Sequence, residues 1–208
     1  MKRVGMNTVV RFFMGVLLAT SLSAFDGTTK SLVGIETGYG QFDYSAANDD
    51  NINMGRTSSS EDFGILGLKI GAETDEFRLF VDAHYYQVDG SFDYANSFGL
   101  SFQYLVFMAK DFNFFFGLNG GLMNLKVVDN AIGKSYEYSD PYIGGDIGFN
   151  YAVYDKLGLE IGLRYININA ENKQYYKDAD SGDTLSRTYT VEQMINIYAS
   201  VIFKFYMD

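Results

Sequence analysis

Apolar and polar residues alternate with period two along most of the chain from about residue 32 onward. The clearest case is residues 157–165, where every odd position is apolar or aromatic and every even position is glycine or charged. Successive side chains of an extended strand point to opposite faces, so this segment predicts a strand with one apolar face. Seven more segments share the pattern: 32–42, 63–73, 77–88, 96–109, 112–125, 141–153 and 190–206. The single proline, Pro141, stands at the start of one of them, where a missing backbone donor is tolerated.

The connections between these predicted strands alternate in length. Three are tight turns, at 74–76, 110–111 and 154–156. Four are longer and polar, at about 43–62, 89–95, 126–140 and 168–189. An up-and-down antiparallel sheet built in this order has its tight turns at one end, together with both chain termini, and its long loops at the other. Transmembrane β-barrels of outer membranes have this asymmetry.

The N-terminal residues have the layout of a secretory signal peptide. Lys2, Arg3 and Arg11 precede an apolar stretch at 12–22, and small residues follow it. The stretch is shorter than the roughly 20 apolar residues that a membrane-spanning helix needs; a short buried helix is the alternative. Cleavage after Ser23 or after Ala24 is compatible with the pattern, and we expect Ala24. The signal peptide is then 1–24 and the barrel domain 25–208.

Composition excludes several classes of protein. The chain has no cysteine, which rules out disulfides, thiolate metal sites and a cysteine nucleophile. A formal net charge of −10 argues against a nucleic-acid partner, whose binding surface should be basic. Phosphate-binding loops and dinucleotide fingerprints are also missing from the sequence.

The distribution of charge predicts which face of the sheet meets lipid. An eight-stranded barrel is only wide enough inside to be filled by side chains, so small residues and paired charges fit there better than rows of bulky ones. Soluble barrels, the alternative, place their apolar residues inside. We therefore expect the apolar face outside and a paired interior charge network. Its predicted members are Glu36, Lys69, Arg78, Asp82, His84, Asp146, Glu160, Arg164 and Lys204.

Aromatic residues gather near the predicted strand ends, as in the interfacial girdles of membrane barrels. The general preference of aromatic residues for strands is the alternative explanation. At the long-loop rim we expect Tyr39, Phe42, Tyr85, Phe98 and Tyr165. At the tight-turn rim we expect Phe77, Phe112, Tyr154, Phe205 and Tyr206.

Taken together, the mature chain resembles the small eight-stranded outer-membrane β-barrels of Gram-negative bacteria, the OmpA-like and OmpX-like proteins. In that family the last strand alternates apolar residues and ends on an aromatic residue, a signal for the barrel assembly machinery. The residues that resemble this signal are Tyr198, Ser200, Val201, Phe203 and Phe205, although the chain itself ends Tyr206-Met207-Asp208.

The resemblance implies an all-β, closed, antiparallel up-and-down transmembrane barrel in the bacterial outer membrane. It further implies a monomer without a cofactor, surrounded by outer-membrane lipid and lipopolysaccharide. The external loops are then the place where a host or surface ligand would bind. On this basis we expect a membrane-structural or surface-interaction (adhesin-like) role, and not an enzyme.

Two other functions remain open from the sequence. A polar lumen is compatible with a narrow channel for ions or small solutes. His84 is the only histidine, and a lipid A acyl hydrolase or transferase would need it beside an activated serine or an acid–base pair. Ser97 and Ser101 lie on the next predicted strand, but no serine pairs convincingly with His84.

Two acidic segments of the predicted loops carry oxygen ligands of the kind that Ca²⁺ prefers. One is Asn48-Asp49-Asp50-Asn51, and the other holds Asp178, Asp180 and Asp183. Their spacing does not match a helix–loop–helix calcium loop, so a solvated acidic loop is the simpler interpretation, and we predict no metal site.

Overall fold

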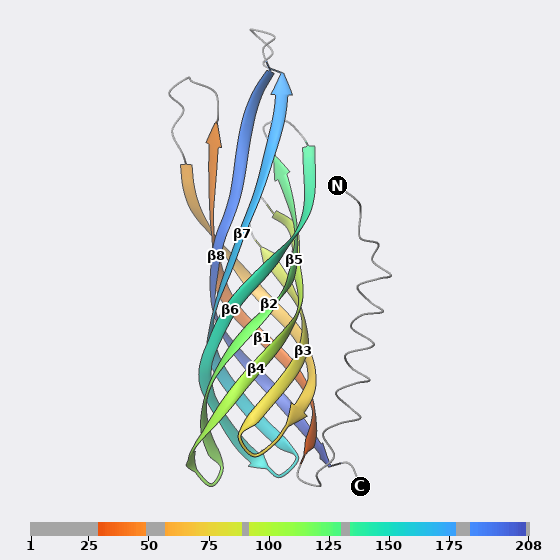
Figure 1. Cartoon of the computed structure of the whole chain (residues 1–208), viewed down its shortest axis with the longest axis vertical. Coiled ribbons are helices and arrows are strands. Elements are labelled where there is room, and N and C mark those ends of the chain that lie inside the picture. Colours follow the sequence, from red (N-terminus) through yellow and green to blue (C-terminus); the bar gives the residue numbers. More distant parts are fainter. Residues whose placement is uncertain (1–28, 49–56, 89–91, 130–133, 178–183, 207–208) are drawn as a thin grey trace.

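The chain forms a closed barrel of eight antiparallel strands, each paired with its neighbours in sequence, and β8 pairs with β1 (Figure 1). The computed structural model describes residues 29–48, 57–88, 92–129, 134–177 and 184–206. Within this part of the chain no helix is long and apolar enough to cross a bilayer. The strands are β1 (Lys30–Asn48), β2 (Thr57–Glu73), β3 (Phe77–Val88), β4 (Phe92–Ala109), β5 (Phe112–Asp129), β6 (Lys134–Tyr154), β7 (Leu157–Lys177) and β8 (Thr184–Tyr206). The predicted fold class is confirmed.

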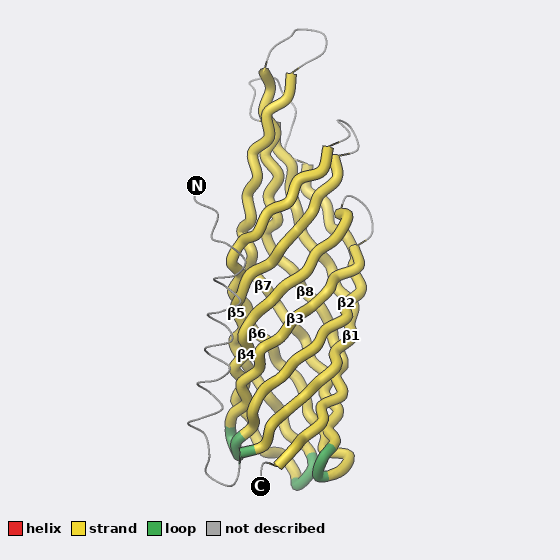
Figure 2. The backbone as a smooth tube through the Cα atoms, turned by 90° about the vertical axis from the view of Figure 1, so that its right-hand side faces the viewer, coloured by secondary structure: helices red, strands yellow, loops and turns green. Residues whose placement is uncertain are grey.

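The strands wind steeply around the barrel axis (Figure 2). One circuit that follows paired residues leaves β5 at Asn113 and returns to β5 at Met123, ten residues further along. This stagger, together with the number of strands, sets the tilt and the width of a barrel. The lumen is therefore narrow, and side chains from opposite walls meet across it.

All three predicted tight turns lie at one end of the barrel, which we call the tight-turn end. They connect β2 to β3 at 74–76, β4 to β5 at 110–111 and β6 to β7 at 155–156. The start of β1 lies at the same end, because Lys30 pairs with both Glu73 and Tyr206. The opposite end, at the top of Figure 1, is the projecting end.

The long polar connections, by contrast, are mostly strand, which corrects the sequence prediction. β1 continues to Asn48 and β2 begins at Thr57, while β7 continues to Lys177 and β8 begins at Thr184. A strand that has left the membrane meets water on its outer face, so it no longer needs alternating apolar residues, although its ladder of hydrogen bonds continues. Residues 1–24, the predicted signal peptide, lie outside the described residues. So do Asp49, Asp50, Asn51, Asp178, Asp180 and Asp183 of the acidic segments, and of Asn48 only the backbone is described.

Pro141 lies within β6 and not at its start, which is a second correction. The described pairing of β6 with β7 ends at Ile143 and Asn167, whereas its pairing with β5 continues to Lys134. At Pro141 the strand is thus paired on one side only. Such an edge position tolerates a residue that has no backbone N–H.

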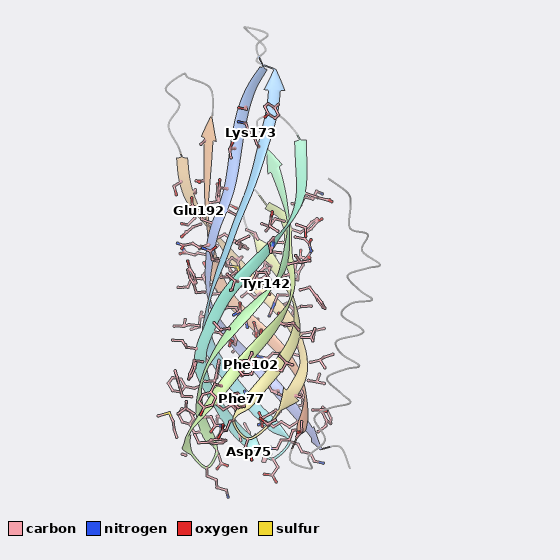
Figure 3. All side chains as sticks on the ribbon, viewed as in Figure 1. Asp75, Phe77, Phe102, Tyr142, Lys173 and Glu192 are labelled. Atoms are coloured by element: carbon pink, nitrogen blue, oxygen red, sulfur yellow. The ribbon has the colours of Figure 1, made fainter. Side chains whose placement is uncertain are left out.

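The outer wall is apolar through the middle of every strand, and we call this surface the apolar belt (Figure 3). On β7, Leu159, Ile161 and Leu163 are 45–52% exposed, whereas Glu160 and Arg164 are buried in the lumen. The predicted orientation of the two faces is confirmed. A soluble barrel would have the reverse arrangement.

Aromatic residues occupy both edges of the apolar belt with one exception. Tyr39, Tyr85 and Tyr165 point outward at the projecting side, and Phe77, Tyr154 and Phe205 do so at the tight-turn side. Phe98 and Phe112 are half-buried, and only the backbone of Tyr206 is described. Phe42 was predicted outward but is fully buried in the lumen. It stands an even number of residues from the inward Glu36, and no bulge in β1 comes before Asp43, so strand alternation itself places it inside.

A row of hydrogen-bonded polar side chains marks where the belt ends at the projecting side. Tyr165 Oη donates to Gln193 Oε1 over 3.0 Å, and Gln193 Nε2 donates to Asp43 over 2.7 Å. The Oγ of Ser60 donates to the same carboxylate over 2.7 Å. Hydrogen bonds from Gln193 and Ser60 hold the pKa of Asp43 below its ordinary value. Polar side chains of this kind are costly in hydrocarbon, so we place the edge of the apolar belt at this row.

Close packing of the strands makes some glycines necessary and leaves others free. A Cβ added at Gly148 would overlap the carbonyl oxygen of Ile161, whereas a Cβ at Gly64 would have no atom within 4 Å. We expect Gly148→Ala to lower the free energy of unfolding by roughly 1–3 kcal/mol through overpacking. Gly64→Ala should be neutral or slightly stabilising, because alanine restricts the unfolded chain. Urea unfolding of the two variants in detergent micelles measures the difference, and equal midpoints would contradict this view of the wall.

Candidate functional site

The lumen holds two layers of side chains, and it is the candidate functional site. A layer of charged residues extends from the tight-turn end to the middle of the barrel, and an apolar layer lies toward the projecting end. The structure places all nine predicted members of the interior charge network inside, each at most 6% exposed. These residues come from six strands, β1, β2, β3, β6, β7 and β8.

A further strand, β4, contributes neutral polar partners to this network. Ser101 Oγ donates to Asp82 over 2.6 Å, and Gln103 Nε2 donates to Asp146 over 2.9 Å. Both donors are themselves buried. Carboxylates on β3 and β6 are therefore hydrogen-bonded from β4, which pairs with β3 on one side and with β5 on the other.

Glu36 is the centre of the network and is fully buried. Arg164 donates to its carboxylate from both Nη atoms, over 2.7 and 3.2 Å. Lys69 Nζ donates over 3.4 Å, and His84 Nε2 lies 3.0 Å from Oε1. Ser200 Oγ adds a hydrogen bond of 3.3 Å. A buried carboxylate needs this many partners because it has lost its water.

A chain of ion pairs continues from this centre toward the tight-turn end. Lys69 Nζ is 2.7 Å from Glu160, and Arg78 Nη1 is 3.0 Å from the other oxygen of the same carboxylate. Arg78 Nε then donates to Glu73 over 2.6 Å, and Lys204 Nζ donates to Glu73 over 2.8 Å. Glu73 was missing from the predicted network, although it has the same strand phase as Lys69 and alternation therefore places it inside.

His84 lies between a serine and an aspartate, an arrangement that resembles a catalytic triad, but all three side chains are buried. Its Nδ1 is 3.4 Å from Ser97 Oγ and 3.5 Å from Asp82 Oδ1. Ser97 also hydrogen-bonds Tyr86 Oη at 3.0 Å. Ser97, His84 and Asp82 are each at most 5% exposed. The contacts describe a histidine held within the lumen.

Asp146 differs from the other interior acids. Among the described residues no cationic nitrogen lies within 4 Å of it, and its partners are Gln103 and Tyr198 Oη, the latter at 3.2 Å. Its Oδ1 has no hydrogen-bond partner, nor does the Nε of Arg164, which faces it across the β6–β7 ladder. Both side-chain polar atoms of Asn119 and of Asn196 are buried and unpartnered too. Buried groups of this kind are normally satisfied by ordered water.

Tyr198 packs against two cations of the charged layer. Its ring centroid is 4.4 Å from Arg164 Cζ and 5.4 Å from Lys69 Nζ, so both cations lie against the aromatic ring. Tyr198 and Ser200, two residues of the predicted assembly signal, face the lumen. Val201, Phe203 and Phe205 face outward. Their role in barrel assembly remains a prediction.

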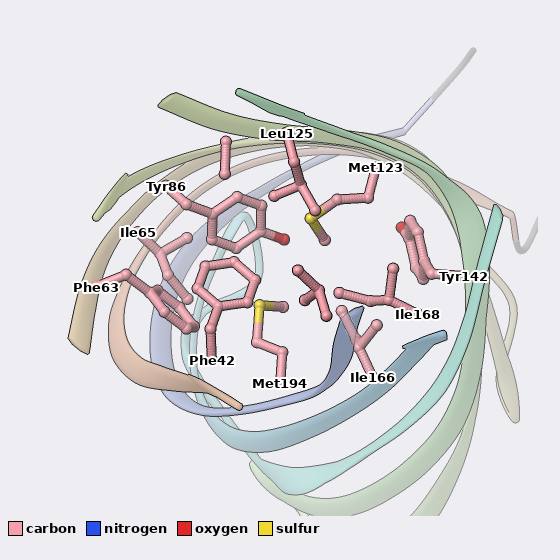
Figure 4. Packing of buried hydrophobic residues seen from close by; sticks show 12 residues of the cluster. Phe42, Phe63, Ile65, Tyr86, Met123, Leu125, Tyr142, Ile166, Ile168 and Met194 are labelled. Atoms are coloured by element: carbon pink, nitrogen blue, oxygen red, sulfur yellow. The ribbon is translucent and has the colours of Figure 1, made fainter. Parts of the chain in front are cut away.

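The layer toward the projecting end is an apolar plug, which the sequence analysis did not predict (Figure 4). Phe42, Phe63 and Tyr86 form its aromatic part, with ring centroids 4.5–5.9 Å apart. We had expected only small residues and ion pairs inside. Strand alternation does place these side chains in the lumen, and the signal was therefore available. The plug consists of Phe42, Phe63, Ile65, Tyr86, Ala95, Met123, Leu125, Tyr142, Ile166, Ile168, Val191 and Met194.

The chemistry of the lumen follows from these two layers. Within the described residues no group of three or more histidine, aspartate or glutamate side chains is arranged to hold a metal ion. Charged side chains are occupied with one another, and the apolar plug separates them from water at the projecting end. The arrangement is suited to filling and bracing the barrel.

Two substitutions that both turn a carboxylate into an amide distinguish paired from unpaired acids. Glu36→Gln removes the negative charge shared by Arg164 and Lys69, and we expect it to lower the free energy of unfolding by roughly 3–5 kcal/mol. Asp146→Asn removes a buried carboxylate that has no cationic nitrogen within 4 Å among the described residues, so we expect a change within about 1 kcal/mol. Urea midpoints of the purified variants test the contrast. A loss at Asp146 as large as that at Glu36 would refute it.

Comparison with known proteins agrees with the architecture. No protein-family model matches the sequence, and no curated protein is similar to it. Among solved structures, Neisserial surface protein A (NspA) is similar with a TM-score of 0.58 and 18% identity over 84% of this chain and 97% of that protein. The outer membrane protein OprG from Pseudomonas aeruginosa has a TM-score of 0.63 and 16% identity over 87% and 99%. OprH from the same organism has a TM-score of 0.50 and 15% identity over 85% and 99%.

At sequence identities this low, the similarity supports a shared fold and nothing more specific. Combined with an apolar outer wall and a charged interior, it gives the conclusion that the chain has the fold of the small eight-stranded outer-membrane β-barrels.

Proposed function

We propose that the protein is a non-conducting outer-membrane barrel with a surface-interaction role. In this proposal the closed barrel serves as an anchor, and the strands of the projecting end are presented to ligands outside the membrane. The observation that carries the proposal is the apolar plug, which fills the lumen at the end from which the strands project. A channel would need a continuous polar path at that level.

The packing of the plug argues against the narrow-channel alternative. Phe42, Tyr86, Met123 and Met194 are fully buried there and come from strands on different sides of the barrel. An ion crossing this layer would lose its hydration without gaining polar ligands, which is costly in an apolar environment. Below the plug, the charged side chains are engaged with one another and would have to separate for an ion to pass.

The projecting strands support the surface-interaction role. Beyond Tyr165, β7 continues to Lys177, and β8 runs beside it from Thr184. Lys173 and Tyr175 are exposed there. A paired extension of this length is more than a membrane anchor requires. NspA, which shares the fold, is by name a surface protein.

Because the chain has no native cysteine, single introduced cysteines can report which end faces outward. Lys173 and Asp75 lie at opposite ends of the barrel (Figure 3) and are both exposed. We expect a membrane-impermeant maleimide to label Lys173→Cys on intact cells, and to label Asp75→Cys only after the outer membrane is permeabilised. The reverse pattern would exclude a surface role for the projecting strands.

Planar-bilayer recordings test whether the lumen conducts. We expect no stable step current from the wild-type protein. The double variant Phe42→Ala, Met194→Ala should show current steps, because it removes two fully buried plug side chains. Leu66→Ala is the matched control, since Leu66 is 61% exposed on the outer wall, and it should stay silent. A reproducible step current from the wild-type barrel would favour the channel alternative and overturn the proposal.

A further inference from the structure

The apolar belt is interrupted by a groove of about 280 Å³ on the outer wall over β5, β6 and β7. Its sides are formed by Phe116, Ile147, Leu163 and Tyr165, all of which point outward and are 45–50% exposed. Gly145 lies between them and also faces outward, because its neighbour Asp146 faces the lumen. The groove is a hollow in a surface that is otherwise covered by large side chains.

The packing of the barrel does not require a glycine at this position. A Cβ at Gly145 would lie 3.2 Å from the carbonyl oxygen of Gly117, a tight contact that a small shift relieves. The next residue along β6 is different, since a Cβ at Gly144 would overlap the carbonyl oxygen of Tyr165. Glycine also costs stability within a strand. The absent side chain at Gly145 therefore has one clear structural result, which is the groove itself.

The position of the groove relates it to one leaflet of the membrane. Gly145 pairs with Tyr165, whose hydroxyl donates to Gln193 in the polar row at the edge of the belt. On its other side the groove reaches Phe116, which packs against Tyr104 and Phe114 in the apolar wall, at centroid distances of 5.5 and 6.4 Å. The hollow thus begins just below the polar boundary at the projecting side and continues into the hydrocarbon layer.

We propose that this groove binds one acyl chain of a membrane lipid, whose head group lies at the level of Gln193 and Asp43. The lining contains one outward polar side chain, Tyr165, and its hydroxyl is already engaged with Gln193. Between apolar surfaces in a bilayer there is no hydrophobic driving force, so association depends on close van der Waals packing. A flexible chain seated in the hollow is contacted from several sides, whereas a second barrel presents a convex wall that would bridge across it.

This inference depends on the lipid-facing orientation of the wall and is independent of the surface-interaction role. Its test uses the full barrel reconstituted in phosphatidylcholine vesicles that contain a phospholipid with a photoreactive group on its acyl chain. After illumination, digestion and mass spectrometry locate the cross-links. We expect them to concentrate on the strand segments around Phe116, Ile147 and Leu163, above the level found on the rest of the apolar belt.

Filling the groove should abolish that enrichment. We expect Gly145→Leu to reduce cross-linking at these segments to the level of the surrounding wall, and Gly145→Ala to reduce it in part. Gly64→Leu is the matched control, because Gly64 also faces outward and has open space around it, and it should leave the enrichment unchanged. Urea midpoints confirm that each variant is folded, and the wild-type distribution is informative even if one variant fails to fold.

Three outcomes would overturn the proposal. The first is uniform cross-linking over the whole wall of the wild-type protein, which describes ordinary surrounding lipid. The second is an enrichment that survives in folded Gly145→Leu. The third is cross-linking between two protein chains through the groove segments, which would assign the hollow to a contact between barrels.

Discussion

Closure of the backbone within hydrocarbon is the constraint on which the rest of this structure depends. In lipid every N–H and C=O must find a partner inside the protein, and a sheet achieves this only by joining its last strand to its first. The pairing of β1 with β8 meets that requirement. Closure then divides every spanning residue between two faces, lipid and lumen, and makes the lumen a narrow space whose contents must pack together.

The lumen meets this packing requirement in two ways. Near the middle, ion pairs centred on Glu36 fill it, and they are favourable only because each carboxylate has several donors. Toward the projecting end the apolar plug fills it instead. The plug keeps bulk water from the upper side of the charged layer and so keeps the ion pairs in a medium where they are strong. Asp146 has no cationic nitrogen within 4 Å among the described residues and keeps one unpartnered oxygen, and the side-chain amides of Asn119 and Asn196 are likewise buried without a partner.

Strand alternation was sufficient to predict the number of strands, their faces and most of the charged interior, because lipid allows few exceptions on the outer face. Strand alternation failed as a guide where the strands extend beyond the membrane. The strand segments beyond Tyr165 were taken for loops, since pairing continues in water without an apolar face. Phe42 was assigned to the aromatic girdle although strand alternation places it inside. Glu73 was left out because it stands at a strand end, where exposure is expected, although alternation places it inside too. The plug was missed because its apolar residues alternate with outward polar ones, as Phe42 does with Gln41 and Asp43, whereas the prediction assigned apolar residues to the outer face.

The same strands therefore pass through three environments, and each environment limits the sequence differently. Within the belt, a charged residue on the outer face would be buried in hydrocarbon, and a bulky residue at Gly148 would collide with β7. Beyond the row of Gln193 and Asp43, Ile168 and Val191 still belong to the plug, and further out the ladder of backbone hydrogen bonds continues where the side chains no longer face hydrocarbon. A surface for recognition can change freely only where side chains do not also hold the barrel together. In this protein that condition is met at the projecting end, while the plug and the charged layer keep the anchor beneath it unchanged.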